Sequence, residues 1–143
     1  MHREETRPMT DRAARQRSII TALYDAAARG DWAAAEAHLT EDFFITEAPG
    51  LPFGGVYCGR GALRELYAKV LPMLAVERLE TEATTCGGDH AVTLVTFHFA
   101  RGLEPVRIAE MFRFEGEAVA EIRPYYFDPE VVDAAVRANR TRT

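Results

Sequence analysis

The chain has 143 residues, of which 48% are hydrophobic and 27% charged, as in a single globular domain. Its net charge of −5 offers no basic surface for a phosphate backbone, so nucleic acid is not an expected partner. No apolar run approaches the ~20 residues of a membrane helix, and the charged N-terminus lacks the apolar centre of a signal peptide. We therefore expect a cytoplasmic protein without membrane contact, in which Cys58 and Cys86 stay free thiols.

The N-terminal half predicts helices and one short strand. Residues 1–10 are expected to be a flexible tail, 11–139 a single domain and 140–143 a flexible end. The first helix is predicted from an apolar stripe with helical spacing, formed by Ile20, Leu23, Tyr24 and Ala27. Asp31 can cap a second helix with the apolar residues Trp32, Ala35 and Leu39.

A strand is expected at 43–47, followed by an irregular loop rich in Pro and Gly, "APGLPFGGVYCG". A third helix is predicted at about 60–71, and Pro72 is expected to end it.

The C-terminal half predicts four consecutive strands. They are "VERLETEATTC", "HAVTLVTFHFA", "PVRIAEMFRFE" and "GEAVAEIRPYYF", and Asp128 followed by Pro129 starts a last helix. Helices first and strands afterwards indicate an α+β fold. We expect a curved antiparallel or mixed sheet wrapped as a cone around three N-terminal helices, with a short C-terminal helix and a cavity open at one end.

Three ionisable side chains fall on apolar strand faces, as judged from the alternation of side chains along a strand. Glu110 lies in the row of Val106, Ile108, Phe112 and Phe114; Glu47 ends the row of Phe43 and Ile45; His98 follows Val92, Leu94 and Thr96. A buried carboxylate is costly unless it is paired or protonated. Structural alternatives remain open: solvent or backbone contacts for Glu47, a satisfied core position for His98, and an ion pair with Arg60 or Arg123 for Glu110.

The strand with His98 is apolar on its other face as well, through Val95, Phe97 and Phe99. A second copy of the chain is the expected cover, so we predict a homodimer. Further lining of a ligand pocket is expected from Tyr67, Tyr126, Trp32, Tyr57 and Phe112. No metal-binding spacing and no dinucleotide-binding glycine motif is present, so neither metal nor cofactor is expected.

The stretches "LYDAAARGDWAAAEAHLTEDF", "PGLPFGGVYCGRGAL" and "AEMFRFEGEAVAEIRPYYFDP" resemble the nuclear transport factor 2-like superfamily, especially its SnoaL-like and ketosteroid isomerase-like branch. The resemblance implies that Glu47 stands where the isomerases keep a carboxylate base. It also implies that Glu110 stands at their protonated acid, the arrangement that serves as a standard example of a neutral carboxylic acid. Tyr67 falls at a supporting tyrosine, while the oxyanion-hole tyrosine position falls at Leu23, with Tyr24 one step out of phase.

The resemblance implies a fold that hosts isomerases, cyclases, epoxide hydrolases, dehydratases and non-catalytic binders, so the fold alone does not give the function. The leading hypothesis is a pocket for a small, largely apolar molecule with cofactor-free acid–base catalysis, in which Glu47 is the base and Glu110 the donor. A non-catalytic ligand-binding module and a dimerisation module of the same fold remain as alternatives.

Overall fold

The computed structural model describes the backbone of residues 2–141 and the side chains of residues 11–141. Its elements are α1 (His2–Arg29), α2 (Trp32–Glu36), β1 (Leu39–Glu47), β2 (Gly55–Cys58), α3 (Ala62–Met73), β3 (Val76–Gly87), β4 (His90–Phe99), the 3-10 turn η1 (Ala100–Gly102), β5 (Val106–Glu115), β6 (Ala118–Tyr126) and α4 (Pro129–Arg140). The backbone of 2–10 continues α1. The flexibility expected of residues 1–10 and 140–143 stays a prediction, and residues 1, 142 and 143 lie outside the described part.

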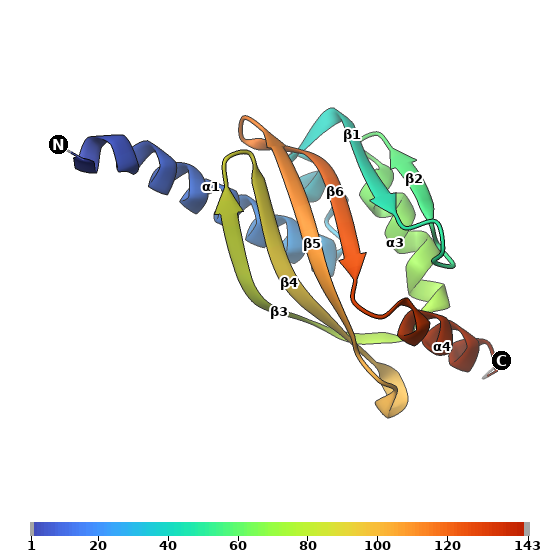
Figure 1. Ribbon diagram of the computed structural model, residues 1–143. Coiled ribbons are helices and arrows are strands. Elements are labelled where there is room, and N and C mark those ends of the chain that lie inside the picture. Colours follow the sequence, from blue (N-terminus) through green and yellow to red (C-terminus); the bar gives the residue numbers. More distant parts are fainter. Residues whose placement is uncertain (1, 142–143) are drawn as a thin grey trace.

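The strands form one curved, mixed sheet in the order β2-β1-β6-β5-β4-β3. Only β1 and β6 run parallel; the other neighbours are antiparallel. Helix α1 crosses one face of the sheet, α3 lies beside β1 and β2, and α4 sits at one end (Figure 1). The expected α+β fold, with helices against a curved sheet, is confirmed. Asp128 caps α4 by accepting a hydrogen bond from the Glu130 amide, with Pro129 in the first turn, as expected.

The main differences from the sequence prediction lie in α2, in the loop after β1 and at the end of α3. Leu39 is not helical: it opens β1 opposite Val119 of β6, because α2 ends after five residues. The loop after Glu47 contains a strand that was not predicted, β2, which pairs antiparallel with β1. Pro72 does not end α3, since the Leu74 amide still donates to the Val70 carbonyl at 2.9 Å and closes a last turn around it.

Register across the sheet decides which residues face the helices. Glu110 of β5 stands opposite Thr93 of β4 and Pro124 of β6. Neighbouring residues on this inner face form the core between sheet and helices, which includes Phe43, Ile45, Val95, Val106, Phe112 and Ile122. The odd-numbered residues of β4 therefore belong to the core, and its even-numbered residues lie on the outer face.

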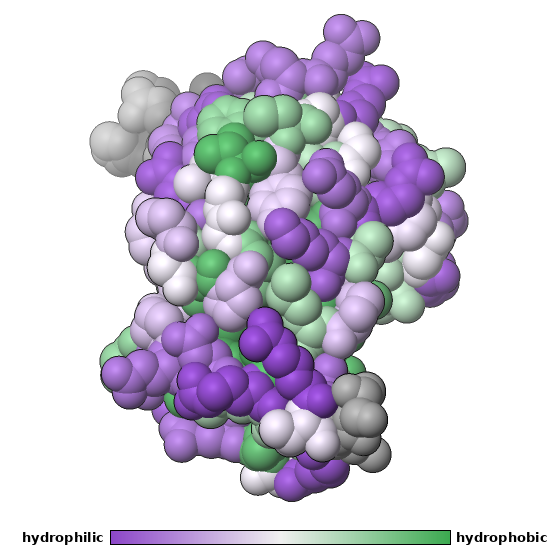
Figure 2. All heavy atoms as spheres, turned by 90° about the vertical axis from the view of Figure 1, so that its right-hand side faces the viewer, coloured by the Kyte–Doolittle hydropathy of each residue, from purple (hydrophilic) through white to green (hydrophobic). Residues whose placement is uncertain are grey.

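Seen from the side of α3 and α4, hydrophobic side chains form separate patches among hydrophilic ones (Figure 2). In the described part of the chain, no helix combines the length and the apolar character that crossing a membrane requires.

Candidate functional site

A cavity of about 430 Å³ lies between α1, α3 and the inner face of the sheet. That volume is in the range of sites for small organic molecules. Most of its wall is apolar, and the polar tips are few. The wall comprises Leu23, Tyr24, Asp25, Ala27, Ala28, Ile45, Glu47, Leu63, Leu66, Tyr67, Val70, Leu71, Val76, Leu79, Thr81, Phe97, Glu110, Phe112, Ile122, Pro124 and Tyr126.

Glu47 is the last residue of β1, and its side chain is only 3% exposed. It points inward because it shares a strand face with Phe43 and Ile45, which are fully buried. Its Oε1 atom is buried and has no hydrogen-bond partner among the described residues. Burial, helped by the negative charge of Glu110, raises the pKa of Glu47 to about 8. At neutral pH this carboxyl is mostly protonated, and a modest rise in pH makes it a base.

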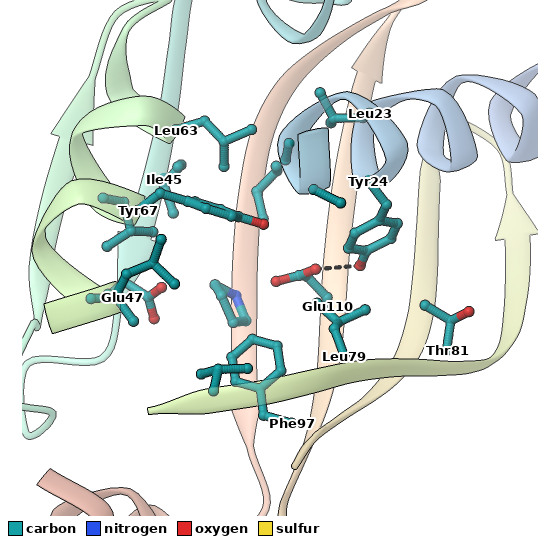
Figure 3. Close-up of a pocket in the computed structure, with 18 of the residues that line it drawn as sticks. Leu23, Tyr24, Ile45, Glu47, Leu63, Tyr67, Leu79, Thr81, Phe97 and Glu110 are labelled. Carbon is teal, nitrogen blue, oxygen red and sulfur yellow. Dashed lines mark hydrogen bonds between the residues drawn. The ribbon is translucent and has the colours of Figure 1, made fainter. Parts of the chain in front are cut away.

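Glu110 lies in the middle of β5, between Ile108 and Phe112 on the inner face. The hydroxyl of Tyr24, from α1, donates a hydrogen bond to its Oε1 atom (Figure 3). Burial raises the pKa of Glu110, and the bond from Tyr24 offsets part of that rise. Because burial favours the protonated form of Glu110, its second oxygen is suited to carry a proton toward the cavity.

Tyr67 and Tyr126 place two more hydroxyl groups on the cavity wall. Burial is the main cause that raises the pKa of both, and nearby carboxylates add to it: Glu110 in the case of Tyr67, Glu47 and Glu110 in the case of Tyr126. Both phenols therefore stay protonated. The Tyr67 ring reaches in from α3 with its hydroxyl toward Glu110, and Glu47 enters from the same side of the space as α3 (Figure 3).

The structure brings together five of the residues expected at the site: Glu47, Glu110, Tyr67, Tyr126 and Phe112. Both carboxyl groups line one cavity, which strand alternation alone could not establish. Their catalytic roles remain predictions.

Three expected lining residues do not reach the cavity wall. His98 lies on the outer face of the sheet, where its Nε2 is 2.7 Å from Oε1 of Glu80. Trp32 packs edge-on against Tyr67 behind the wall, with 5.2 Å between the ring centroids. Tyr57 is buried under the loop after β1 and donates to the Phe53 carbonyl at 2.7 Å.

Tyr24 is a site residue that was not predicted from the sequence. Both Leu23 and Tyr24 line the cavity, because α1 lies along it and presents two adjacent positions of its apolar stripe. Tyr24 belongs to the apolar stripe recognised in the sequence, and that membership was the signal that could have identified it.

An ion pair of Glu110 with Arg123 is not formed: Arg123 bonds Glu121 on the outer face, at 2.6 Å. Among the described residues, no group of three or more His, Cys, Asp or Glu is placed to hold a metal ion.

Comparison with known proteins identifies the family of the chain. Residues 20–122, more than half of the chain, match the SnoaL-like domain. The chain belongs to the SnoaL-like family. No curated protein matches it.

Solved structures share the SnoaL-like protein's fold at low identity. A nuclear transport factor 2-like protein of unknown function from Burkholderia pseudomallei has a TM-score of 0.74 and 20% identity, over 85% of this chain and 97% of its own. TerC, co-crystallized with polyporic acid, has a TM-score of 0.76 and 17% identity, over 86% and 98%. A protein from a soil-derived mobile gene cassette has a TM-score of 0.73 and 16% identity, over 87% and 98%. Likeness at this level establishes the fold.

Proposed function

We propose that this SnoaL-like protein binds a small, largely apolar molecule in the cavity and catalyses a cofactor-free proton transfer on it. One observation carries the proposal: Glu47, buried and with an unpaired oxygen, opens onto the same cavity as the hydrogen-bonded Tyr24–Glu110 pair. Two carboxyl groups in unlike settings, one free and one held by a phenol, are suited to separate base and donor roles.

In the proposed reaction, ionised Glu47 removes a proton from the carbon next to a carbonyl group. The electron pair of the broken C–H bond moves onto the carbonyl oxygen and forms an enolate. The electron pair then returns from the enolate oxygen to carbon, and Glu47 gives the proton back at the same carbon, which exchanges it, or at another carbon, which isomerises the molecule. A base held by strand β1 at the edge of an apolar space contributes on the order of 10²–10⁴-fold to such a step.

Glu110 supplies the complementary group in this proposal. As a neutral acid it donates a hydrogen bond to the developing oxyanion, while Tyr24 holds its other oxygen. A donor placed before the reaction begins stabilises that charge without reorganisation, which is worth on the order of 10²–10³-fold for one hydrogen bond. Tyr126 and Tyr67 orient the ligand from either wall.

Proton exchange on a simple ketone tests the proposal without knowledge of the natural substrate. The bicyclic ketone α-tetralone is incubated with the protein in deuterated buffer, and loss of the signal of its α protons is followed by NMR. We expect exchange faster than in buffer alone, abolished by Glu47→Gln. The matched control is Glu80→Gln, which removes an outer-face carboxylate and should leave exchange unchanged.

The non-catalytic alternative gives a different result. If α-tetralone shifts the melting temperature but its protons exchange at the buffer rate, the cavity is a binding site and the catalytic part of the proposal is wrong. The wall is largely apolar and carries a few polar groups. The catalytic and the non-catalytic hypotheses therefore both include binding of a small ligand.

We also propose that a second copy of the chain covers the outer face of the sheet. The apolar side chains exposed on this face are not those predicted from the sequence. Val95 and Phe99 are in the core, whereas Leu94 is 45% exposed. Leu94 registers with Ala109 of β5, and Ala109 with Tyr125 of β6, so an apolar row crosses three strands, and Tyr125 is 53% exposed. Charges of both signs, such as Arg123 and Glu80, lie near this row, so ion pairs between two copies related by a two-fold axis are compatible with it.

A cytoplasmic location stays part of the proposal. It is supported by Cys58 and Cys86, both of which are free thiols in the structure.

A further inference from the structure

The charged groups of the cavity wall are all of one sign. Among the described residues that line it, Asp25, Glu47 and Glu110 are acidic, and there is no Lys, Arg or His. Asp25 is exposed, toward the rim, whereas Glu47 is only 3% exposed. A ligand that carries a carboxylate or phosphate would therefore enter an apolar space with no counter-charge, which is strongly unfavourable.

The same wall has the features that recognise an organic cation. Glu47 presents a buried carboxyl oxygen with no hydrogen-bond partner, so an N–H donor from a ligand would satisfy it. Five aromatic side chains surround the space, and their ring faces attract a positive charge. They are Tyr24, Tyr67, Phe97, Phe112 and Tyr126.

From this combination we propose that the cavity takes a lipophilic amine, held as its ammonium ion at Glu47 and enclosed by the aromatic rings. The amine head satisfies the unpaired carboxyl oxygen, and the hydrocarbon body fills the apolar part of a cavity of about 430 Å³. The inference rests on the ligand-binding half of the proposed function and does not need the proton transfer.

Binding of the ammonium ion changes the protonation of Glu47. The titratable groups that share the cavity wall with Glu47 are the carboxyls of Asp25 and Glu110 and the phenols of Tyr24, Tyr67 and Tyr126, none of which carries positive charge. With a pKa of about 8, Glu47 is mostly protonated at neutral pH, and pairing with an ammonium ion ionises it. Amine binding at neutral pH should therefore release about one proton, and binding of an uncharged ligand none.

Three probes of one shape separate charge from apolar contact: naphthylmethylamine, naphthylmethanol and naphthoic acid. Affinity is measured by calorimetry on the full chain at neutral pH, in two buffers of different ionisation enthalpy, which reveals proton release. We expect the amine to bind about tenfold more tightly than the alcohol or better, with release of about one proton, and the acid not to bind. Glu47→Gln should bring the amine to the affinity of the alcohol, and Glu80→Gln should leave the difference intact.

Each contrary result has its own meaning. Equal affinity for amine and alcohol, or preference for the acid, overturns the inference while the proposed ligand cavity stands. Absence of binding by all three probes overturns both. If Glu47→Gln does not fold, the proton release by the wild-type protein decides: amine binding with no release contradicts pairing at Glu47.

Discussion

Tyr24 and Glu110 are 86 positions apart in the chain, yet the phenol of one donates a hydrogen bond to the carboxyl of the other inside the cavity. The contact joins α1 to the centre of β5. It occupies one oxygen of Glu110, keeps the carboxyl group oriented and leaves the second oxygen for a ligand. A hydrogen-bonded carboxyl donor that lines the same cavity as a free carboxyl is the relationship on which the proposed chemistry depends.

Replacement of Tyr24 by Phe tests that relationship. The ring should keep its edge-on contact with Phe112, at 6.0 Å between centroids, so the fold should persist. Because the lost hydrogen bond had lowered the pKa of Glu110, that pKa should rise further and the acid should become a weaker donor. We expect exchange of α-tetralone to slow by about tenfold or more, with the alkaline limb of the pH–rate profile moved to higher pH. An unchanged rate and profile would exclude a role for Tyr24.

Glu47 should make stability depend on pH. Its pKa is about 8 in the folded protein against an ordinary 4.5, so the folded state holds a proton that the unfolded chain has released. The resulting stability is complete below about pH 4.5 and is lost as the pH rises through about 8. Glu47→Gln, which cannot ionise, should reduce the loss of unfolding free energy across this range by up to a few kcal/mol, measured in urea. Parallel curves for both proteins would contradict the buried position.

Much of the fold could be predicted because the alternation of side chains and the capping residues are local signals. Phe43, Ile45 and Glu47 share a face wherever β1 pairs, and Asp128 caps α4 from its own sequence context. The side of the sheet to which His98 points could not be predicted. Both faces of β4 are apolar, and only its register with β5, Thr93 opposite Glu110, decides between them.

Tyr24 shows a second limit of sequence analysis. Its contact with Glu110 depends on how α1 is rotated and placed over the sheet, which is a matter of packing between distant segments. The same holds for Trp32 and Tyr57, whose aromatic character suits a ligand wall and a protein core equally well. In the fold they support Tyr67 and the loop after β1 from behind.

The loop that follows Glu47 is expected to be sensitive at Gly54. A Cβ atom at that position would lie 2.3 Å from the Ala48 carbonyl oxygen, so the backbone next to Glu47 would have to move. Gly54→Ala should lower the free energy of unfolding by about 1–3 kcal/mol and weaken probe binding. Gly50→Ala is the matched control in the same loop, since a Cβ there meets nothing within 4 Å. Equal effects of the two substitutions would show that the close approach does not matter.

The outer face of the sheet provides a test of the proposed dimer. Leu94→Glu adds a charge to the centre of the apolar row, and the substituted side chain remains solvated in a monomer. Light scattering coupled to size-exclusion chromatography should show a dimer for the wild-type chain and a monomer for Leu94→Glu. Phe127→Ser, at a side chain that is 83% exposed beyond the end of β6, is a comparison for general loss of apolar surface. A wild-type monomer would rule the proposal out.

Titration of the Glu47 carboxyl by carbon NMR tests the central claim most directly, since it reports on that one group in the cavity. Our account predicts a midpoint near pH 8, because the carboxyl is buried in the cavity wall. A midpoint near the ordinary 4.5 would mean that Glu47 faces water and not the cavity.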